Sequence, residues 1–462
     1  MAFRNYHQHH LVGLLLMTIF AVISCVQVSG QNCDVDENTP TVWLGDVEDD
    51  FYCKGNLTHC SHFGLDYVCE DPDGGSLEPC ENGTKVMCAS PAVQMADPTP
   101  ATTLRVLAYN VYEIRYLYFQ SGQQERTCRI PRLVFTMHPD LDVIVFNEVF
   151  MGGCFAPFDD SIETSTLTIR DMLDQYGFNY YTYTVAEGPG EPFPLLENSG
   201  IFVASRWPIL KNASRVFNVT ETYAVTAKGV MYTEINKTVN GESQIYHVFG
   251  THMQAFGTED ADEVRVTQAN IIRNFMLEQN IPTSQPVIYA GDLNAKMNTT
   301  NGDDVIEAFD ATVPRLVGDL YVTYDHQNND MFNENTTENS TWLDYVMYSS
   351  SHLQPTTATL QVVRPRMDPL EVCWRAISPF PAYPGMDACR DTRVITDLSD
   401  HYAVLGTFDF DHDDVLFTTP FNPSRHPSTL QPFTTDSTNA LRCLGGWSAA
   451  VFVILTVILQ QW

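Results

Sequence analysis

Several residues with catalytic or metal-binding side chains stand at the ends of apolar runs that resemble β-strands: Asn110, Glu148, His252, Asp292, Asn294, Asp400 and His401. Apolar strands bring their terminal residues to one edge of a sheet, so these side chains are expected to meet there. Carboxylate and amide oxygens suit Mg²⁺ as ligands, and a histidine beside an aspartate suits proton abstraction near neutral pH. The pattern therefore predicts a metal-assisted acid–base site.

Each of these residues also has an ordinary structural interpretation. A single Asn, or an Asp-Leu-Asn run, commonly forms a turn after a strand. A single His at a strand end is commonly a hydrogen-bonded surface group. The functional interpretation depends on several such strand ends occurring in one chain.

The elements that must position these side chains are short apolar runs and amphipathic segments. Strands are predicted at 104–109, 142–146, 246–250, 286–290 and 402–408. Apolar residues at helical spacing predict a helix over 264–281, with acids just before it, and another over 130–137, ahead of the second strand. Mixed strands and helices indicate an α+β or α/β protein built in layers.

The chain has 462 residues, of which 44% are hydrophobic, and a formal net charge of −32. This composition supports a large core and excludes a disordered or fibrous protein. The negative charge argues against nucleic-acid binding through clustered Lys and Arg. It is compatible with an enzyme that neutralises a phosphate with a bound cation.

Both ends of the chain carry apolar segments typical of processing signals. Residues 11–23 are apolar and precede small residues, so residues 1–30 are predicted to be a secretory signal peptide, with an N-terminal anchor as the alternative. Residues 447–459 are also apolar and follow a short spacer. Residues 440–462 are therefore predicted to be a GPI-anchor signal, with a membrane-spanning tail as the alternative.

The chain has 12 cysteines, and ten remain once Cys25 and Cys443 leave with the processed ends. An even number in a secreted chain predicts disulfides. A zinc cluster is the alternative, but no paired C-x-x-C spacing supports it. The disulfide candidates are Cys33, Cys53, Cys60, Cys69, Cys80, Cys88, Cys128, Cys154, Cys373 and Cys389.

Sequons and composition agree with a secreted chain of several regions. Residues 31–90 are predicted to form a Cys-rich, disulfide-stapled module, 91–103 a linker, 104–411 the catalytic domain and 412–439 a Ser/Thr/Pro stalk. The N-x-S/T sequons predict a glycosylated surface. They stand at Asn56, Asn82, Asn212, Asn218, Asn236, Asn298, Asn335 and Asn339.

Eight motifs occur in an order that resembles one enzyme superfamily: NVY (110–112), FNEVF (146–150), SRWPI (205–209), KGVMYTEI (228–235), GTHMQA (250–255), GDLNA (291–295), LDYV (343–346) and SDHYAV (399–404). Over roughly residues 104–410 the chain resembles the endonuclease/exonuclease/phosphatase superfamily and, within it, the secreted bacterial-type neutral sphingomyelinases. GDLN and SDH occur across the superfamily. FNEVF, SRWP, KG-x-x-Y and THMQA together are specific to the sphingomyelinase branch.

The resemblance implies an α+β fold, a four-layer α/β/β/α sandwich of the DNase I type. It implies that Glu148 is the principal Mg²⁺ ligand with Asn110 beside it, and that Mn²⁺ or Co²⁺ can substitute. It also implies that His401 is the general base and that Asp344 orients its ring.

The remaining site residues receive supporting roles from the same resemblance. Asp292 and Asn294 are expected to position the attacking water and a phosphate oxygen. His252 is expected to stabilise the phosphoryl oxygens or the leaving oxygen, and Asp400 to support the metal or water network. The implied reaction is hydrolysis of sphingomyelin to ceramide and phosphocholine. With a divalent ion to withdraw charge from the phosphate, this chemistry needs no Lys or Arg clamp.

The segment after Glu148 departs from the family pattern. Residues 151–153 are Met-Gly-Gly, where bacterial members usually carry an acid and an Asn, so the sequence does not support a second, peripheral metal contact there. Cys128 and Cys154 flank Glu148, and a bond between them would brace it.

A membrane contact is expected just before the SDH motif. Exposed aromatic and apolar side chains there would let the enzyme reach a lipid headgroup in place. The expected contact residues are Trp374, Ile377, Phe380 and Tyr383. The alternative is a disulfide-closed loop whose aromatic rings pack inward.

Other functions stay open at the level of the sequence. A nuclease or another phospholipase-C-type phosphodiesterase could use the same fold, although the acidic charge and the branch-specific motifs weigh against a nuclease. An inactive surface-binding module would need none of the catalytic side chains, and all of them are retained. The preferred lipid headgroup and the partner of the Cys-rich module are undefined.

Overall fold

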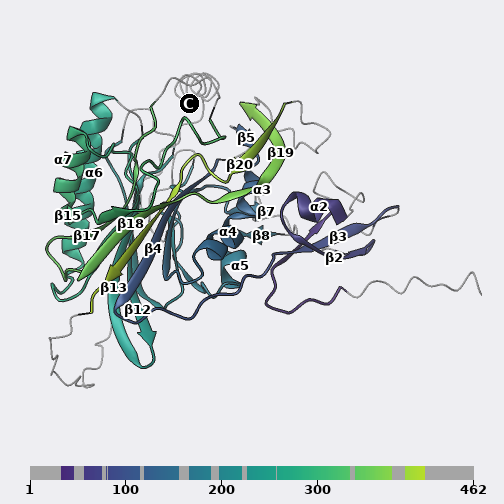
Figure 1. The fold of residues 1–462 in the computed structure, drawn as a ribbon, viewed down its shortest axis with the longest axis horizontal. Coiled ribbons are helices and arrows are strands. Elements are labelled where there is room, and N and C mark those ends of the chain that lie inside the picture. Colours follow the sequence, from purple (N-terminus) through teal and green to yellow (C-terminus); the bar gives the residue numbers. More distant parts are fainter. Residues whose placement is uncertain are drawn as a thin grey trace, which may run out of the picture.

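The computed structural model describes residues 33–45, 57–74, 80, 82–114, 119–155, 166–188, 197–220, 226–255, 258–332, 339–376 and 391–411. Two sheets stack face to face within this part of the chain (Figure 1). The first has the strand order β16 (Arg315–Val317), β18 (Thr357–Val363), β21 (Ala403–Asp409), β4 (Thr103–Glu113), β6 (Val143–Val149), β10 (Phe202–Ser205) and β9 (Tyr180–Tyr181).

The second sheet has six strands among the described residues, and each predicted apolar run lies in one of the two sheets. Its order is β11 (Ile209–Val216), β12 (Gly229–Val239), β13 (Glu242–His252), β14 (Val287–Asp292), β17 (Asp344–Ser349) and β15 (Ala311–Thr312). The central strands of both sheets are almost wholly buried, which explains why they appear in the sequence as continuous apolar runs.

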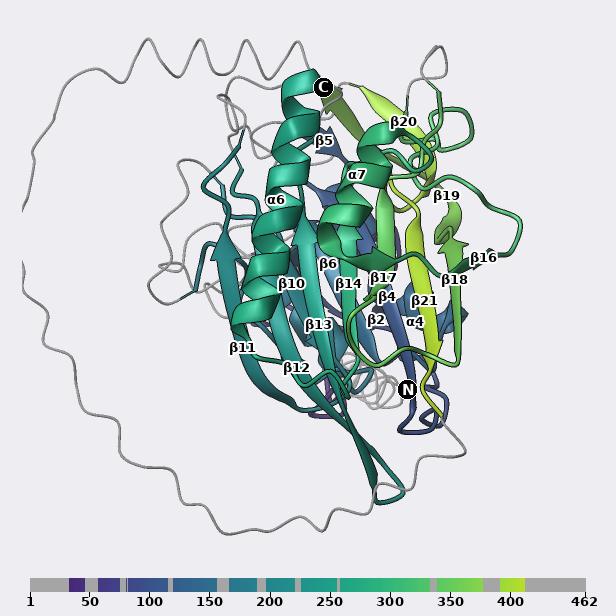
Figure 2. The same cartoon turned by 90° about the vertical axis from the view of Figure 1, so that its left-hand side faces the viewer.

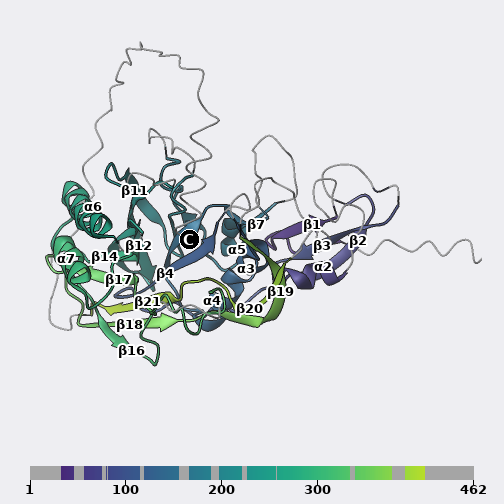
Figure 3. The ribbon, with the colours of Figure 1, turned by 90° about the horizontal axis from the view of Figure 1, so that it is seen from above.

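Helices cover the outer faces of the two sheets. Helices α6 (Glu259–Glu278) and α7 (Thr300–Phe309) lie over the six-stranded sheet, as Figure 2 shows. On the opposite side of the stack lie α3 (Gln123–Thr127), α4 (Ile130–Met137) and α5 (Ile169–Asp174), and the view from above shows the layers in sequence (Figure 3). The predicted four-layer α/β/β/α sandwich is confirmed.

Strand β4 shows how the layers are held together. Its side chains alternate between two hydrophobic cores, because successive residues of a strand point to opposite faces. Leu104, Val106 and Ala108 belong to the core that includes the other sheet and α6. Leu107, Tyr109 and Val111 belong to the core formed with α4, α5 and the N-terminal module.

Helix α6 begins five residues earlier than the apolar spacing predicts. Thr258 caps it by accepting a hydrogen bond from the backbone N–H of Ala261. The acids that appear to precede the helix therefore lie in its first turn, where the helix dipole favours negative charge.

The N-terminal module is a three-stranded sheet with one helix, and it packs beside α3 and α4 (Figure 1). Its elements are β1 (Thr41–Leu44), α2 (Leu57–His62), β2 (Asp66–Asp71) and β3 (Lys85–Ala89). Disulfides Cys33–Cys69 and Cys60–Cys88 staple it, and Cys128–Cys154 joins α3's end to β7 (Gly153–Phe155). Cys80 and Cys373 are also disulfide-bonded, whereas Cys53 and Cys389 lie outside the described residues.

Small sheets extend the edge of the sandwich. One has the order β20 (Thr392–Asp397), β19 (Arg366–Ala376) and β5 (Phe119–Ser121), and β7 pairs with β8 (Leu167–Thr168). Trp374 is half-buried in β19, and its ring lies 4.7 Å from the guanidinium carbon of Arg393. The other expected membrane-contact residues, Ile377, Phe380 and Tyr383, lie outside the described residues.

The predicted signal peptide, stalk and GPI signal also lie outside the described residues. Within the described part, no helix is long and apolar enough to cross a membrane. Among the sequons, Asn236 is half-buried, and Asn56 and Asn335 are not described. The exposed sequon residues are Asn82, Asn212, Asn218, Asn298 and Asn339.

Candidate active site

Strand direction explains why the predicted site residues meet. Strands β4 and β6 are parallel, as are β13 and β14, so all four end at the same edge of the stack. Strands β17 and β21 are antiparallel to β14 and β4, so their first residues lie where those strands end. Accordingly His252, Asp292 and Asp344 are neighbours in register across the six-stranded sheet.

Asn110 joins carboxylates that come from the two sheets. Its side-chain Nδ2 donates to Oε1 of Glu148 over 3.0 Å and to Oδ2 of Asp292 over 3.2 Å. Its Oδ1 accepts from the backbone N–H of Tyr112 over 3.1 Å, which fixes the orientation of the amide. Glu148 has a φ of 60°, a sparsely populated conformation for a residue other than glycine, of the kind that is often found at functional sites.

His401 and Asp344 form a buried dyad. Nδ1 of His401 lies 2.8 Å from Oδ2 of Asp344, and Nε2 of His401 lies 3.8 Å from Oδ2 of Asp292. The Tyr324 ring packs against the imidazole, with 4.7 Å between ring centroids. Because a carboxylate only accepts, the Nδ1 proton is held by Asp344 and Nε2 faces the site.

Asp292 lies between His252 and Asp344 in the sheet, and His252 is paired with Lys228. Nε2 of His252 lies 3.5 Å from Oδ2 of Asp292 and 3.9 Å from Oε1 of Glu148. Nζ of Lys228 donates to the same Nε2 over 2.7 Å. Burial, together with the charges of Lys228 and His401, holds the pKa of His252 well below its usual range. His252 is therefore a neutral imidazole whose proton sits on Nδ1.

The remaining predicted residues support this centre. Asp400 is buried, and one of its oxygens lies 3.2 Å from Oγ of Ser399, which donates to the backbone carbonyl of Asn110 over 2.7 Å. The backbone N–H of Asn294 donates to Oδ1 of Asp292 over 2.8 Å. The side-chain amide of Asn294 donates to the carbonyl of Met253 over 3.2 Å, so Asn294 contacts Asp292 through its backbone and not through its side chain.

Sequence reasoning missed two residues of the site. Asn147 connects the sheets, since its Nδ2 donates to the Thr251 carbonyl and its Oδ1 accepts from the Asp292 N–H, each over 3.0 Å. Lys228 places a buried ammonium among acidic groups, although the predicted chemistry did not require a cationic side chain. Asn147 lies in the FNEVF motif and Lys228 begins the KGVMYTEI motif, so these motifs could have identified both residues from the sequence.

Burial dominates the electrostatics of the site. Burial and the charge of Asp344 raise the pKa of Asp292 to about 7, and burial raises that of Asp400 to about 7. Burial lowers the pKa of Lys228 to about 8. Burial also lowers the pKa of His401, but Asp344, Asp292 and Asp400 together outweigh it and raise that pKa well above the usual range. Buried groups with strongly shifted pKa values that face one another in this way are typical of functional sites.

The donor set fits a hard divalent cation. Oε2 of Glu148 is buried and has no hydrogen-bond partner among the described residues, although burying an unpaired carboxylate oxygen is costly. Asp292, Asp344 and His401 offer ligand atoms within 4.8 Å of one another and form a second candidate group. Because Asp344 already holds Nδ1 of His401, the unpartnered oxygen of Glu148 is the better starting point for a metal site.

Comparison with known proteins finds relatives that cover most of the chain. No protein-family model matches the chain. Sphingomyelinase C of Bacillus cereus is 26% identical over 340 residues, which cover 70% of this chain and 95% of the relative. Sphingomyelinase C of Listeria ivanovii is 26% identical over 328 residues, which cover 68% of this chain and 89% of the relative.

Solved structures agree with the fold. A mutant of beta toxin from Staphylococcus aureus with bound magnesium ions is similar, with a TM-score of 0.54 and 24% identity. The similarity covers 67% of this chain and 100% of that chain. The chain therefore shares the fold of this beta toxin, and the resemblance to bacterial-type sphingomyelinases is confirmed.

Proposed function

We propose that this chain is a Mg²⁺-dependent sphingomyelinase, which hydrolyses sphingomyelin to ceramide and phosphocholine. The observation that carries the proposal is the meeting of Glu148, Asn110 and Asp292 with the His401–Asp344 dyad at one buried edge. These side chains can hold a cation and a general base next to the same phosphate. The similarity to sphingomyelinases C over 70% of the chain supports the choice of a phosphodiester lipid.

Glu148 would hold the Mg²⁺ through Oε2. Asn110, whose Nδ2 faces Glu148 and Asp292, would orient these two carboxylates rather than act as the metal ligand that the resemblance implies. When bound, the ion withdraws charge from the phosphoryl oxygens and stabilises the leaving alkoxide, which is worth several kcal/mol. Asp292 shares the Nδ2 of Asn110 with Glu148, so it lies next to that position and can orient a water molecule there.

His401 is the general base in this proposal. Its Nδ1 is bonded to Asp344, which leaves Nε2, on the side of Asp292, to take the proton of the attacking water. Asp344 fixes this tautomer and stabilises the positive charge that develops on the ring. The water would lie between Nε2 of His401 and the carboxylate of Asp292.

Lys228 and His252 supply positive charge and a neutral ring near the phosphate. The sequence assigned the stabilisation of phosphoryl oxygens to His252, but its Nε2 accepts from Lys228. We therefore assign that stabilisation to the ammonium of Lys228, oriented by His252. A buried ammonium is effective here because the surroundings screen its charge less than water would.

The setting of the enzyme is part of the proposal. Disulfides within the described residues support an extracellular location. We propose further that the exposed sequons carry glycans, that Trp374 and its neighbours contact lipid, and that the C-terminal segment directs attachment of a GPI anchor.

The test is release of phosphocholine from vesicles of defined lipids by the purified mature chain. Activity is expected with Mg²⁺, loss with EDTA, and recovery when Mg²⁺ is restored. Glu148→Gln should abolish the release while keeping the fold, because Gln keeps the shape and loses the anionic ligand. Full activity of Glu148→Gln in EDTA would contradict the metal assignment. Cleavage of plasmid DNA without cleavage of any choline lipid would identify a nuclease instead.

A further inference from the structure

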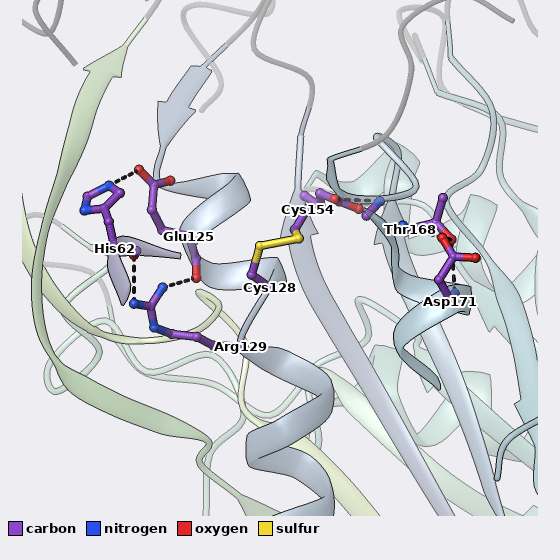
Figure 4. The surroundings of a disulfide bond; sticks show 9 residues. His62, Glu125, Cys128, Arg129, Cys154, Thr168 and Asp171 are labelled. Atoms are coloured by element: carbon purple, nitrogen blue, oxygen red, sulfur yellow. Dashed lines mark hydrogen bonds and ion pairs between the residues drawn. A yellow bond between two sulfur atoms is a disulfide. The ribbon is translucent and has the colours of Figure 1, made fainter. Parts of the chain in front are cut away.

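The N-terminal module contacts helix α3, which lies between the module and the active site. Nε2 of His62, at the end of α2, pairs with Oε1 of Glu125 in α3 over 3.0 Å. Arg129, just after α3, donates to the carbonyls of Ser61 and His62 over 3.0 and 2.8 Å (Figure 4). Both partners of the His62–Glu125 pair are largely buried, with side-chain exposures of 18% and 13%, so the contact is a packed interface.

The module also contacts the other side of the Cys128–Cys154 disulfide. Phe63 packs edge-on against Phe155 in β7, with 4.8 Å between ring centroids. Phe155 follows Cys154 directly, and Glu125 and Arg129 lie on either side of Cys128. The module therefore touches both segments that this disulfide joins, as Figure 4 shows for the α3 side.

Arg126, in the same short helix, connects α3 to the catalytic loops. Its side chain is fully buried, and the guanidinium donates to five oxygen atoms. Nη1 donates to the carbonyls of Val111 and Leu398 over 2.9 and 2.7 Å, and Nη2 donates to the carbonyl of Tyr112 over 2.7 Å. Nε and Nη2 donate to the backbone and side-chain oxygens of Ser121.

The carbonyls that Arg126 holds flank the catalytic residues. Val111 and Tyr112 follow Asn110, and Leu398 precedes the Ser399–Asp400–His401 segment. One guanidinium thus fixes the spacing between the segment with the Asn110 amide and the segment with the base. A planar guanidinium with five donors can do this, and a lysine ammonium cannot match its geometry.

A buried carboxylate ties β7 to the same strand end. Oε1 of Glu113, in β4, accepts from the backbone N–H of Gly153 over 3.0 Å. Gly153 begins β7 and lies between Glu148 and Cys154 in the chain. Helix α3 and strand β7, the two segments that the module contacts, are therefore both linked by hydrogen bonds to residues close to Asn110.

We propose that the N-terminal module is an intramolecular brace of the active site, and that Arg126 is the positioning residue through which the brace acts. The module holds α3 and β7, and Arg126 holds the loops that carry Asn110 and His401. The structural part of this proposal is independent of the substrate, and only its activity readout rests on the proposed function.

Charge reversal at the interface tests the brace in the full mature chain. Glu125→Lys should raise hydrogen–deuterium exchange in residues 110–112 and 398–401 and lower kcat by about tenfold, with KM little changed, because catalytic groups lose part of their alignment. The double variant His62→Glu with Glu125→Lys restores an opposite-charge pair and should recover both readouts. The matched control is Glu278→Lys, which breaks the exposed Arg215–Glu278 pair on α6 and should change neither.

Arg126→Lys tests the positioning residue directly. It keeps the charge but loses the fork, and kcat should fall by roughly 10²-fold when measured at a temperature at which circular dichroism shows the variant to be folded. The melting temperature should also fall, because buried carbonyls lose their donor. If Arg126→Lys does not fold, the Glu125→Lys pair of experiments decides the question alone. Unchanged exchange in both segments for Glu125→Lys would overturn the brace. The two proposals can also fail separately. If the wild-type chain cleaves no choline lipid but Glu125→Lys still raises exchange in residues 110–112 and 398–401, the proposed function is overturned and the brace is supported.

Discussion

At the scale of single residues, the hydrogen-bond partner of each side-chain atom indicates the role of that residue in the site. Nδ1 of His401 is held by Asp344, Nε2 of His252 is held by Lys228, and Oε2 of Glu148 has no partner among the described residues. The two histidines therefore have different roles, although both stand at strand ends in the sequence. A divalent cation that offsets the neighbouring carboxylates would lower the raised pKa of His401 and let Nε2 take a proton. His252 acts as an acceptor that orients the ammonium of Lys228.

His401→Ala should lower kcat/KM by roughly 10²–10⁴-fold, the range for loss of a positioned general base. In the wild type kcat/KM should fall toward acid pH as His401 takes a proton. Asp344→Asn should also lower activity and move that decline to lower pH, since it removes a charge that raises the pKa of His401. A pH series of phosphocholine release measures both effects. Wild-type activity of His401→Ala from pH 6 to 9 would exclude this base.

At the scale of elements, the sheets are joined at both ends by buried polar groups. Asn147 connects them at the active-site edge. At the opposite edge Lys237 of β12 pairs with Asp142 over 2.8 Å and donates to the carbonyl of Thr103, at the start of β4. Trp207 Nε1 donates to the same carboxylate over 2.7 Å. Register between the layers is thus specified by polar contacts as well as by packing.

Lys237→Met should destabilise the fold by about 3–5 kcal/mol, because it leaves the carboxylate of Asp142 buried without its cation. The side chains of the pair are 0% and 1% exposed, so water cannot replace the lost partner. Denaturant unfolding of the purified chain measures this change. The control is Lys211→Met, at an exposed position of the neighbouring strand β11, which should lower the free energy of unfolding by much less than Lys237→Met. An equal loss of unfolding free energy in Lys237→Met and Lys211→Met would contradict a structural role for the buried pair of Lys237 and Asp142.

At the scale of the whole molecule, a divalent cation held by Glu148 would compete with the protons on the neighbouring carboxyls of Asp292 and Asp400. The pKa values of Asp292 and Asp400 are raised to about 7 in the folded chain. A raised carboxyl pKa contributes stability below its unfolded value, about 3.9, and that contribution is lost as pH rises through about 7. At pH 8 the metal-free fold therefore contains repelling carboxylates that a cation can neutralise.

Mg²⁺ should raise the melting temperature more at pH 8 than at pH 6, because at pH 6 it must displace protons from these carboxyls. Thermal unfolding with EDTA and with Mg²⁺ at the two pH values measures the difference. Glu148→Gln should reduce the Mg²⁺-dependent rise in melting temperature at both pH values. An equal rise at pH 6 and pH 8 in the wild type would show that binding of the cation is not coupled to the protonation of Asp292 and Asp400.

The amino-acid sequence by itself was sufficient for the elements and for most of the site. Short apolar runs predicted the central strands, and the polar residues at their ends pointed to Asn110, Glu148, His252, Asp292 and His401. This worked because strand-forming apolar runs are local properties of the chain. The family resemblance added the pairing of the two sheets and the expected role of Asp344.

Only the tertiary structure decided how distant residues pair. Arg126 and Leu398 are 272 residues apart, and Asn147 and Asp292 are 145 apart, so no local pattern joins them. The same holds for the Cys33–Cys69 and Cys60–Cys88 disulfides. It also holds for the contact of His62 with Glu125, which joins the Cys-rich module to the catalytic domain. Lys228 appeared in the sequence as one residue of a motif, and its burial beside His252 follows from the stacking of two sheets. Such contacts depend on the three-dimensional packing of whole layers, which periodicity along one chain does not encode.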